Sequence, residues 1–320
     1  MFPPTGVDVA GCAYTQPRIA FRAALARDLV AATHAATPDP QPRRPTRTRE
    51  HPEDPPAMCF DLDSQPPIPP IAGGAIDTEE LVLRSGDGGR FAGFLARAEK
   101  PIGAGIVVLP DVRGLHPYYE ELALGFAEAG IDALSIDYFG RTAGIGVRER
   151  TGDFDFMTHV AETRFSSLSW DVQAAAERLR SLGDGRDRAI FTIGFCFGGR
   201  LAFMTATMGL DLAGVIGFYG WPVGSARSDV PAPADSTGLM RGSVLGIFGG
   251  ADHGIPAEAI ETFEAALAAA GVPNEVVTYP GAPHSFFDRK QEDYAQASED
   301  AWGRVLAFIR ANTPGAPARA

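Results

Sequence analysis

Three side chains in this 320-residue sequence have the types and the chain order needed for nucleophilic catalysis. Cys196 lies in Gly194-Phe195-Cys196-Phe197-Gly198-Gly199, and Asp252 and His284 follow it along the chain. A thiolate can attack a carbonyl carbon, while a histidine takes and returns the proton and a carboxylate fixes the histidine tautomer. The three residues therefore predict acyl-transfer chemistry, with Cys196 as nucleophile, His284 as general base and Asp252 as its partner.

The residues around Cys196 form the pattern Gly-x-Cys-x-Gly between a predicted strand and a predicted helix. Residues 189–195 are β-branched, aromatic and apolar, as in a buried strand, and residues 201–206 continue as a buried helix. A strand that turns sharply into a helix at such a pattern is typical of the nucleophile elbow of α/β-hydrolases. The helix N-terminus would help to stabilise a thiolate. The alternative is a small buried cysteine that only packs between the strand and the helix.

Asp252 and His284 each follow a predicted strand, 244–249 and 275–279 respectively. Since catalytic groups gather at the carboxyl ends of strands in parallel sheets, we expect both side chains to lie near Cys196. The order nucleophile, acid, histidine is also that of α/β-hydrolases. Alternatively, Asp252 caps the helix that starts near Pro256, and His284 is a surface loop histidine.

The oxyanion formed during acyl transfer needs two N–H donors. The first is expected from the backbone of Phe197, directly after the nucleophile. The second is expected from the loop after the predicted strand 105–110, where Val112 is the first candidate.

Strands alternate with helices through most of the chain, which indicates an α/β protein with a doubly wound, mostly parallel sheet. A glycine-rich turn at 85–89 between residues 79–84 and 90–95 predicts an antiparallel hairpin at the N-terminal side of the sheet. Together with the elbow, this pattern predicts the α/β-hydrolase fold. The further strands expected from apolar runs are 131–137 and 212–220, and the expected later helices are 257–270 and 301–309.

Residues 1–57 differ in composition from everything that follows. Dense proline and arginine with few apolar residues predict a disordered extension, and residues 58–320 are predicted to form the α/β-hydrolase domain. Two other interpretations are an over-long start whose true initiator is Met58, and a basic interaction or targeting arm.

Composition limits the partners and the compartment. A formal net charge of -12 argues against nucleic acid or an anionic membrane surface as the main partner. No apolar run is long enough for a membrane span, and no secretory signal is apparent. Three well-separated cysteines do not form a disulfide framework, so the cytoplasm is the expected location. No metal-ligand spacing, phosphate loop or dinucleotide fingerprint is present, so neither a metal nor a cofactor is expected. The predicted assembly is a monomer or a small homo-oligomer.

The motifs at Cys196, at Asp252 followed by Ile255-Pro256, and in Tyr279-Pro280-Gly281-Ala282-Pro283-His284-Ser285-Phe286 resemble the dienelactone hydrolase (carboxymethylenebutenolidase) family. The resemblance covers about residues 75–312. It implies a cysteine hydrolase without metal or cofactor that opens an enol-lactone to maleylacetate. It also implies that an acid in the position of Asp111, usually Glu in the family, holds the resting thiol neutral.

The same resemblance raises questions about substrate recognition. The family binds a substrate carboxylate with an arginine four residues after the catalytic histidine, where this chain has Asp288. An acid there would repel an anionic lactone and favour neutral esters. Arg141 is the match for the family's other carboxylate-binding arginine. Aromatic side chains are candidates for an apolar acyl pocket, with core packing as the alternative: Tyr118, Tyr119, Phe139, Tyr219 and Trp221.

The sequence thus predicts hydrolysis of a small-molecule lactone or small ester through an acyl-enzyme on Cys196. A broader carboxylesterase or thioesterase with the same triad is the first alternative. A non-hydrolytic member whose cysteine senses redox state, or whose pocket only binds a ligand, is the second. The Asp252 and His284 motifs argue against a sensor, because a redox-sensing thiol needs neither residue.

Overall fold

The computed structural model describes residues 61–72, 77–150, 152–182 and 188–316. By its internal contacts the chain divides into residues 1–53 and residues 54–320, and every helix and strand named below belongs to the second unit. The extension predicted for residues 1–57 lies outside the described residues.

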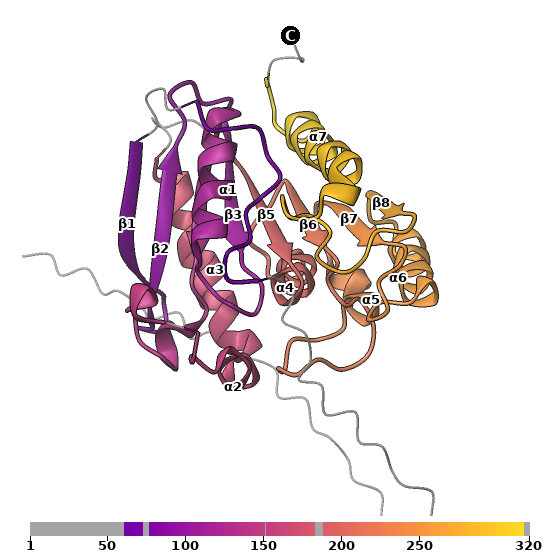
Figure 1. Cartoon of the computed structure of the whole chain (residues 1–320), viewed down its shortest axis with the longest axis horizontal. Helices are drawn as coiled ribbons and strands as arrows, with labels where there is room; N and C mark the ends of the chain where they lie inside the picture. Colours follow the sequence, from indigo (N-terminus) through magenta and orange to yellow (C-terminus); the bar gives the residue numbers. More distant parts are fainter. Residues whose placement is uncertain (1–60, 73–76, 151, 183–187, 317–320) are drawn as a thin grey trace, which may run out of the picture. The chain divides into compact units, whose positions relative to one another are not determined.

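One eight-stranded sheet, ordered β1-β2-β4-β3-β5-β6-β7-β8, forms the centre of the domain (Figure 1). β1 and β2 form an antiparallel hairpin, and β2 also pairs antiparallel with β4. From β4 to β8 all neighbouring strands run parallel, which confirms the predicted mostly parallel sheet with its N-terminal hairpin. The strands are β1 (Asp77–Arg84), β2 (Arg90–Arg97), β3 (Ala104–Leu109), β4 (Ile131–Ile136), β5 (Ala189–Phe195), β6 (Gly214–Phe218), β7 (Ser243–Gly249) and β8 (Asn274–Tyr279).

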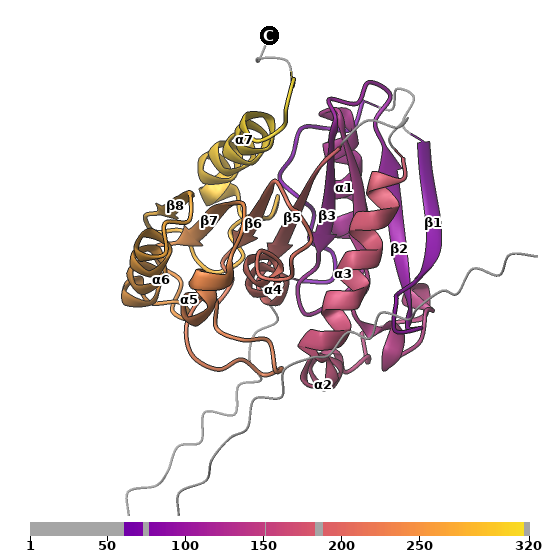
Figure 2. The same ribbon diagram turned by 180° about the vertical axis from the view of Figure 1, so that it is seen from behind.

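Helices cover both faces of this sheet. Figure 1 shows α1 and α7 in front of the strands, and Figure 2 shows α3, α4 and α6 on the opposite side. The last helix begins at Ala295, earlier than the sequence predicted. The helices are α1 (Pro117–Glu128), α2 (Phe156–Glu162), α3 (Phe165–Arg180), α4 (Phe197–Thr205), α5 (Pro233–Ser236), α6 (Ala257–Ala269) and α7 (Ala295–Ala311), with short 3-10 helices at 139–141, 147–149, 237–239 and 292–294.

The central strands are buried on both faces. Every residue of β3, β4 and β6 is buried, because helices pack on either side of a parallel sheet. β3 and β6 are accordingly continuous apolar runs, whereas β4 also carries the buried Asp132 and Ser135. Within the described residues, no helix is both long enough and apolar enough to cross a bilayer.

Four segments with predicted catalytic roles leave the sheet at its carboxyl edge. The loop 110–116 follows β3, Cys196 follows β5, Asp252 follows β7 and His284 follows β8. Since β3, β5, β6, β7 and β8 are consecutive parallel neighbours, their carboxyl ends bring these segments to one side of the domain.

Candidate active site

Cys196 occupies a sharp turn between β5 and α4. Its backbone has φ 54° and ψ -113°, a conformation that L-residues rarely adopt and that stores local strain. Cys196 N–H donates to the Phe218 carbonyl of the neighbouring strand end, which holds the turn over the sheet. The Cys196 side chain is partly exposed.

The glycines around Cys196 are required because the backbone of α4 approaches its surroundings closely. A Cβ atom on Gly194 would lie 1.9 Å from the Gly198 carbonyl oxygen. A Cβ atom on Gly198 would lie 2.1 Å from the carbonyl oxygens of both Leu109 and Pro110. These contacts are with backbone atoms, which cannot move aside as a flexible side chain can.

We expect Gly198→Ala to destabilise the protein by about 2–3 kcal/mol, the usual range for overpacking a closed site. The matched control is Gly303→Ala in α7, where an added Cβ would meet nothing within 4 Å and alanine favours the helix. Thermal denaturation should show a clear loss of Tm for Gly198→Ala and little change, or a small gain, for Gly303→Ala. Equal Tm values for the two variants would contradict the steric account of the elbow.

Asp252 and His284 are joined directly. His284 Nδ1 lies 2.6 Å from Asp252 Oδ2, and the Asp252 side chain is buried. A carboxylate oxygen accepts hydrogen bonds, so this contact favours the imidazole tautomer with its proton on Nδ1. Asp252 Oδ1 accepts from the N–H groups of Gly254 and Ile255, at 2.8 and 3.2 Å.

The alternative role of Asp252 as a helix cap is not observed. The N-cap of α6 is Pro256, without a side-chain capping bond, so Asp252 closes the preceding turn and does not cap the helix. His253, the chain neighbour of Asp252, is exposed.

A cavity of about 300 Å³ opens beside Cys196 and His284. Its walls come from the loop after β3, from α2, from the start of α4, from the loop after β6 and from the turn after β7. Val112, Phe197, Tyr219 and Trp221, the candidates from the sequence for the oxyanion and acyl sites, are among the residues that line it. The remaining lining residues are Met157, Val160, Arg200, Ala226, Arg227, Gly254 and Ile255.

Two backbone N–H groups at this cavity are available as donors. Phe197 is the first residue of α4, where N–H groups have no partner within the helix. Within the described residues, the N–H of Val112 also has no hydrogen-bond acceptor. Since both residues line the cavity with Cys196, this arrangement can stabilise negative charge on an oxygen bound between them.

Hydrogen bonds to two tyrosine side chains and within the turn fix the loop that carries Val112. Asp111 N–H donates to the Tyr119 hydroxyl, and the Tyr138 hydroxyl donates to the Pro110 carbonyl at 2.6 Å. Gly114 N–H donates to the Asp111 carbonyl, which closes a tight turn around Val112. Burial raises the pKa of the Tyr138 hydroxyl well above its ordinary value, so that it remains a neutral donor.

The Asp111 side chain pairs with Arg113. Asp111 Oδ1 accepts from the Arg113 N–H and Nε, and Oδ2 lies 3.0 Å from Nη2. Both side chains are fully buried. Burial alone would lower the pKa of Arg113, yet the charge of Asp111 holds that pKa above its ordinary value. Asp111 therefore braces the Val112 turn, and it is not among the residues that line the cavity.

Two predicted substrate residues are not brought to the cavity. Arg141 binds Asp171, Asp87 and Ser85 on another part of the domain, which corrects its predicted role in binding a substrate carboxylate. Tyr118 is buried in α1, and its hydroxyl donates to the Phe287 carbonyl, so it packs beneath the site instead of lining it.

The expected repulsion by Asp288 is also wrong. Asp288 is buried, and its Oδ1 accepts from the N–H groups of Gln65 and Lys290, at 3.3 and 3.0 Å. The carboxylate is thus used to hold the chain near Gln65, and it does not line the cavity. Its presence gives no reason to exclude an anionic substrate.

Two arginines at the cavity were not singled out from the sequence. Arg200 is buried and donates to four carbonyls of the loop after β6, those of Trp221, Val223, Gly224 and Val230. Burial lowers the pKa of Arg200 to about 10, which leaves it charged at neutral pH. Arg227, in contrast, is exposed at the cavity and has no hydrogen-bond or ion-pair partner in the described part of the chain.

Nothing in the described residues suggests a metal centre, since no group of three His, Cys, Asp or Glu side chains gathers there.

Comparisons with known proteins place these features in a family context. Residues 91–313 match the model of the "Dienelactone hydrolase family". A "Putative carboxymethylenebutenolidase" from Salmonella typhimurium is 28% identical over 256 residues, covering 76% of this chain and 93% of its own. Its counterpart in Escherichia coli K12 is 28% identical over 209 residues, covering 64% and 76%. A crystal structure described as a putative dienelactone hydrolase from Klebsiella pneumoniae aligns with a TM-score of 0.64 and 27% identity, covering 74% of this chain and 99% of its own. This likeness confirms the α/β-hydrolase fold.

Proposed function

The chain belongs to the dienelactone hydrolase family and is an ester or lactone hydrolase, and on this premise we propose that it works through Cys196, His284 and Asp252. The observation that carries the proposal is the hydrogen bond between His284 and Asp252 at the cavity that also holds Cys196. A redox-sensing or purely ligand-binding thiol would have no use for that bond. The substrate is a small lactone or carboxylic ester.

In the acylation half-reaction, His284 Nε2 takes the proton of the Cys196 thiol while Asp252 holds the ring and stabilises the imidazolium. The thiolate attacks the carbonyl carbon, and the carbonyl oxygen becomes an oxyanion that accepts from the N–H groups of Phe197 and Val112. The ester C–O bond then breaks, and His284 returns the proton to the leaving oxygen. With a lactone the leaving oxygen stays attached to the acyl group.

In the deacylation half-reaction, a water molecule gives one proton to His284 and attacks the thioester carbon. The same two N–H groups receive the second oxyanion. The carbon–sulfur bond breaks, the carboxylic acid leaves, and His284 returns the proton to the Cys196 sulfur. Each half-reaction thus leaves the protein in the protonation state in which it began.

The cavity walls favour a mostly apolar acyl group. Met157 and Val160 of α2 line the cavity together with Trp221, Ile255 and Cys196, and such apolar walls exclude water from an acyl chain. This lining supports the second candidate, a broader carboxylesterase with the same three residues. The two candidates differ in whether the substrate also carries a negative charge.

Arg227 provides a test of substrate charge. If the substrate carries a carboxylate, we expect Arg227→Ala to raise KM for a carboxylate-bearing lactone about tenfold, since a hydrogen bond between two charged groups is lost. KM for a neutral ester should change little. Arg241→Ala is the matched control, because the Arg241 guanidinium donates to the carbonyls of Gly238 and Met240 in its own turn and does not line the cavity. Equal KM values for the anionic lactone in the wild type and the Arg227 variant would favour the broader esterase.

The proposed function is tested by incubating the purified protein with p-nitrophenyl acetate and with a small enol-lactone, and following product release. We expect measurable hydrolysis of at least one of the two, and loss of that hydrolysis when Cys196 is alkylated. Hydrolysis that continues at the same rate after alkylation of Cys196 would rule out the proposed nucleophile.

A further inference from the structure

We propose that residues 61–72, which we call the N-terminal clasp, position the two loops that carry out catalysis. The inference rests on the proposed function, because the loops concerned are those that carry Val112 and His284. The clasp lies before β1 in the chain and runs beside α1 (Figure 1). In the chain it is far from both loops, so its contacts with them are long-range tertiary contacts.

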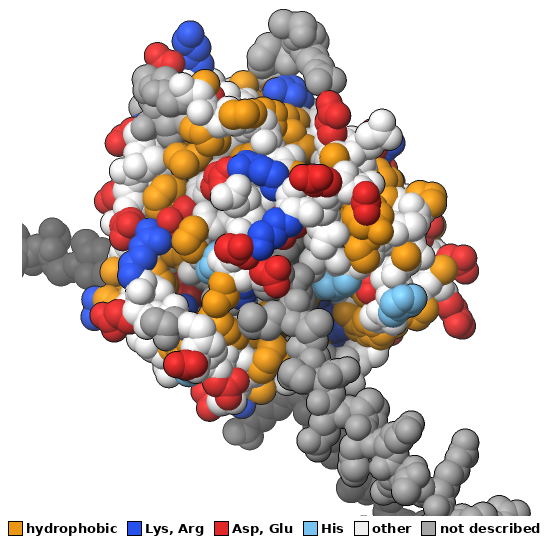
Figure 3. Space-filling view, in the orientation of Figure 1, with side chains coloured by type: hydrophobic (Ala, Val, Ile, Leu, Met, Phe, Trp, Pro, Cys, Tyr) orange, Lys and Arg blue, Asp and Glu red, His pale blue; other side chains and the backbone are white. Residues whose placement is uncertain are grey.

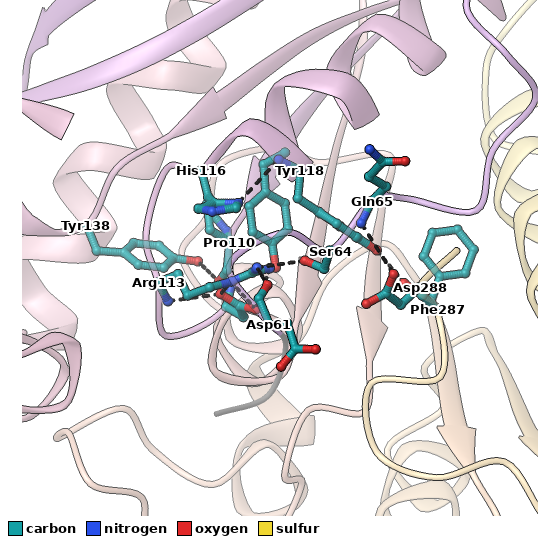
Figure 4. Close-up of polar contacts among 12 residues, drawn as sticks. Asp61, Ser64, Gln65, Pro110, Arg113, His116, Tyr118, Tyr138, Phe287 and Asp288 are labelled. Carbon is teal, nitrogen blue, oxygen red and sulfur yellow. Dashed lines mark hydrogen bonds and ion pairs between the residues drawn. The ribbon is translucent and has the colours of Figure 1, made fainter. Parts of the chain in front are cut away.

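The first arm of the clasp reaches the Val112 loop through Arg113. Arg113 Nη1 donates to the Asp61 carbonyl and to the Ser64 hydroxyl, each at 2.7 Å (Figure 4). Ser64 is itself buried, and its N–H donates to the Asp61 carbonyl, so the two acceptors form one small turn. Nε of Arg113 donates to Asp111, and Nη2 lies 3.0 Å from Asp111 Oδ2. Asp61 and Ser64 therefore fix the guanidinium that braces the turn around Val112.

His116 lies near Arg113 and Leu62, at the first arm of the clasp. It caps α1 by accepting from the Tyr118 N–H at 3.4 Å. Burial and the nearby charge of Arg113 lower the pKa of His116 to about 4, so it is neutral at physiological pH and adds no charge beside Arg113. Because His116 is neutral, it does not repel the Arg113 guanidinium, which remains paired with Asp111.

The second arm of the clasp reaches the loop that follows His284. Gln65 N–H donates to Asp288, and Arg289 N–H donates to the Gln65 carbonyl at 2.8 Å. The Arg289 guanidinium donates to the Gln65 side chain and to the Pro66 carbonyl, and Lys290 pairs with Asp63. Figure 4 shows Ser64 and Gln65 next to each other, facing Arg113 and Asp288 respectively. One turn of chain therefore holds both loops at a fixed separation.

The rest of the clasp anchors it to the domain. Ile68 is buried against α1, where a Cβ on Gly125 would lie 2.4 Å from its side chain, and Ala72 N–H donates to Glu128. Arg289 pairs with Glu121, and Lys290 pairs with Asp63. Figure 3 shows basic and acidic side chains next to one another on the face toward the viewer. Anchoring and loop contacts thus involve different residues, which makes them separable by mutation.

Loss of the contact between Ser64 and Arg113 should weaken stabilisation of the transition state and leave substrate binding unchanged. The Val112 N–H has to point at the oxyanion, and its direction depends on a turn whose brace is Arg113. Loss of the Ser64 hydroxyl leaves a buried cation with one acceptor fewer, so Arg113 and with it the Val112 turn become less well fixed. Substrate binding in the apolar cavity does not use this contact. Ser64 is a positioning residue, and its removal should lower kcat and leave KM nearly unchanged.

The test compares Ser64→Thr with Ser64→Val in the full chain, using p-nitrophenyl acetate. The two side chains have the same shape, and only threonine keeps the hydroxyl. We expect Ser64→Val to lower kcat about tenfold relative to Ser64→Thr, with KM the same within twofold. Alkylation of Cys196 by iodoacetamide needs no oxyanion site, so its rate should be the same in both variants.

Leu179→Ala is the control, because Leu179 is buried in α3, on the opposite face of the sheet from α1 and the clasp. It should lower Tm and leave kcat unchanged below the unfolding transition. Equal kcat values for the Thr and Val variants would overturn the inference, as would a loss of kcat in all three variants that follows their loss of Tm. Failure of the proposed function looks different, because the wild type would then hydrolyse ester with Cys196 fully alkylated.

Discussion

Cys196→Ala is expected to lower kcat for ester hydrolysis by about 10⁴-fold or more, because the variant lacks the sulfur proposed to carry the acyl intermediate. The substitution removes only a sulfur atom from a residue that already carries a Cβ at positive φ. Backbone strain at the elbow is therefore the same in both proteins. The measurement is steady-state hydrolysis of p-nitrophenyl acetate beside a thermal denaturation curve for each protein.

Cys196→Ser is the companion variant. A serine hydroxyl fits the same turn but ionises far less readily than a thiol, so we expect partial activity well below that of the wild type. The Ala variant should melt at the same temperature as the Ser variant. Wild-type turnover by the Ala variant would show that the reaction does not pass through Cys196.

His284→Ala is the second large effect, with an expected loss of about 10³–10⁴-fold in kcat because the thiol then has no base. Asp252→Asn should have an effect of similar size, because an amide in place of the carboxylate favours the wrong ring tautomer and cannot stabilise the imidazolium. Groups that act as a unit are not additive. The double variant of His284 and Asp252 should therefore be no slower than His284→Ala alone.

The control for these variants is His253→Ala. His253 follows Asp252 directly in the chain but is exposed, and the described structure gives it no contact with the carboxylate. Its substitution should leave kcat and KM unchanged. A large loss of kcat in this variant, or multiplicative losses in the double variant, would contradict the assignment of His284 as the base that Asp252 orients.

The sequence predicted the structural features that depend on residues close together in the chain. The apolar runs predicted the strands, because a parallel strand covered on both faces needs no polar alternation. Gly194, Gly198 and Gly199 predicted the elbow, because no side chain fits between the turn and its neighbours. The positions of Asp252 and His284 after their strands predicted that both would reach the same edge of the sheet.

The sequence was uninformative where a side chain's partner lies far along the chain. Asp288 was interpreted as a substrate-repelling acid, but its partner is Gln65, more than two hundred positions away. Arg141 follows a strand as a binding residue would, yet its partners lie in the β1–β2 turn and in α3. Arg113 shows no motif at all, and only its contacts with Asp111 and Ser64 reveal its role. Such side-chain directions depend on tertiary packing, which neither composition nor spacing records.

The most direct test of the account is to label the nucleophile during turnover. The protein is mixed with p-nitrophenyl trimethylacetate, whose bulky acyl group leaves slowly, and is then quenched in acid, digested and weighed peptide by peptide. We predict a burst of p-nitrophenol equal to the protein concentration, and one trimethylacetyl group on the peptide that contains Cys196. A burst that labels a different residue, or p-nitrophenol release while Cys196 stays unlabelled, would contradict the account.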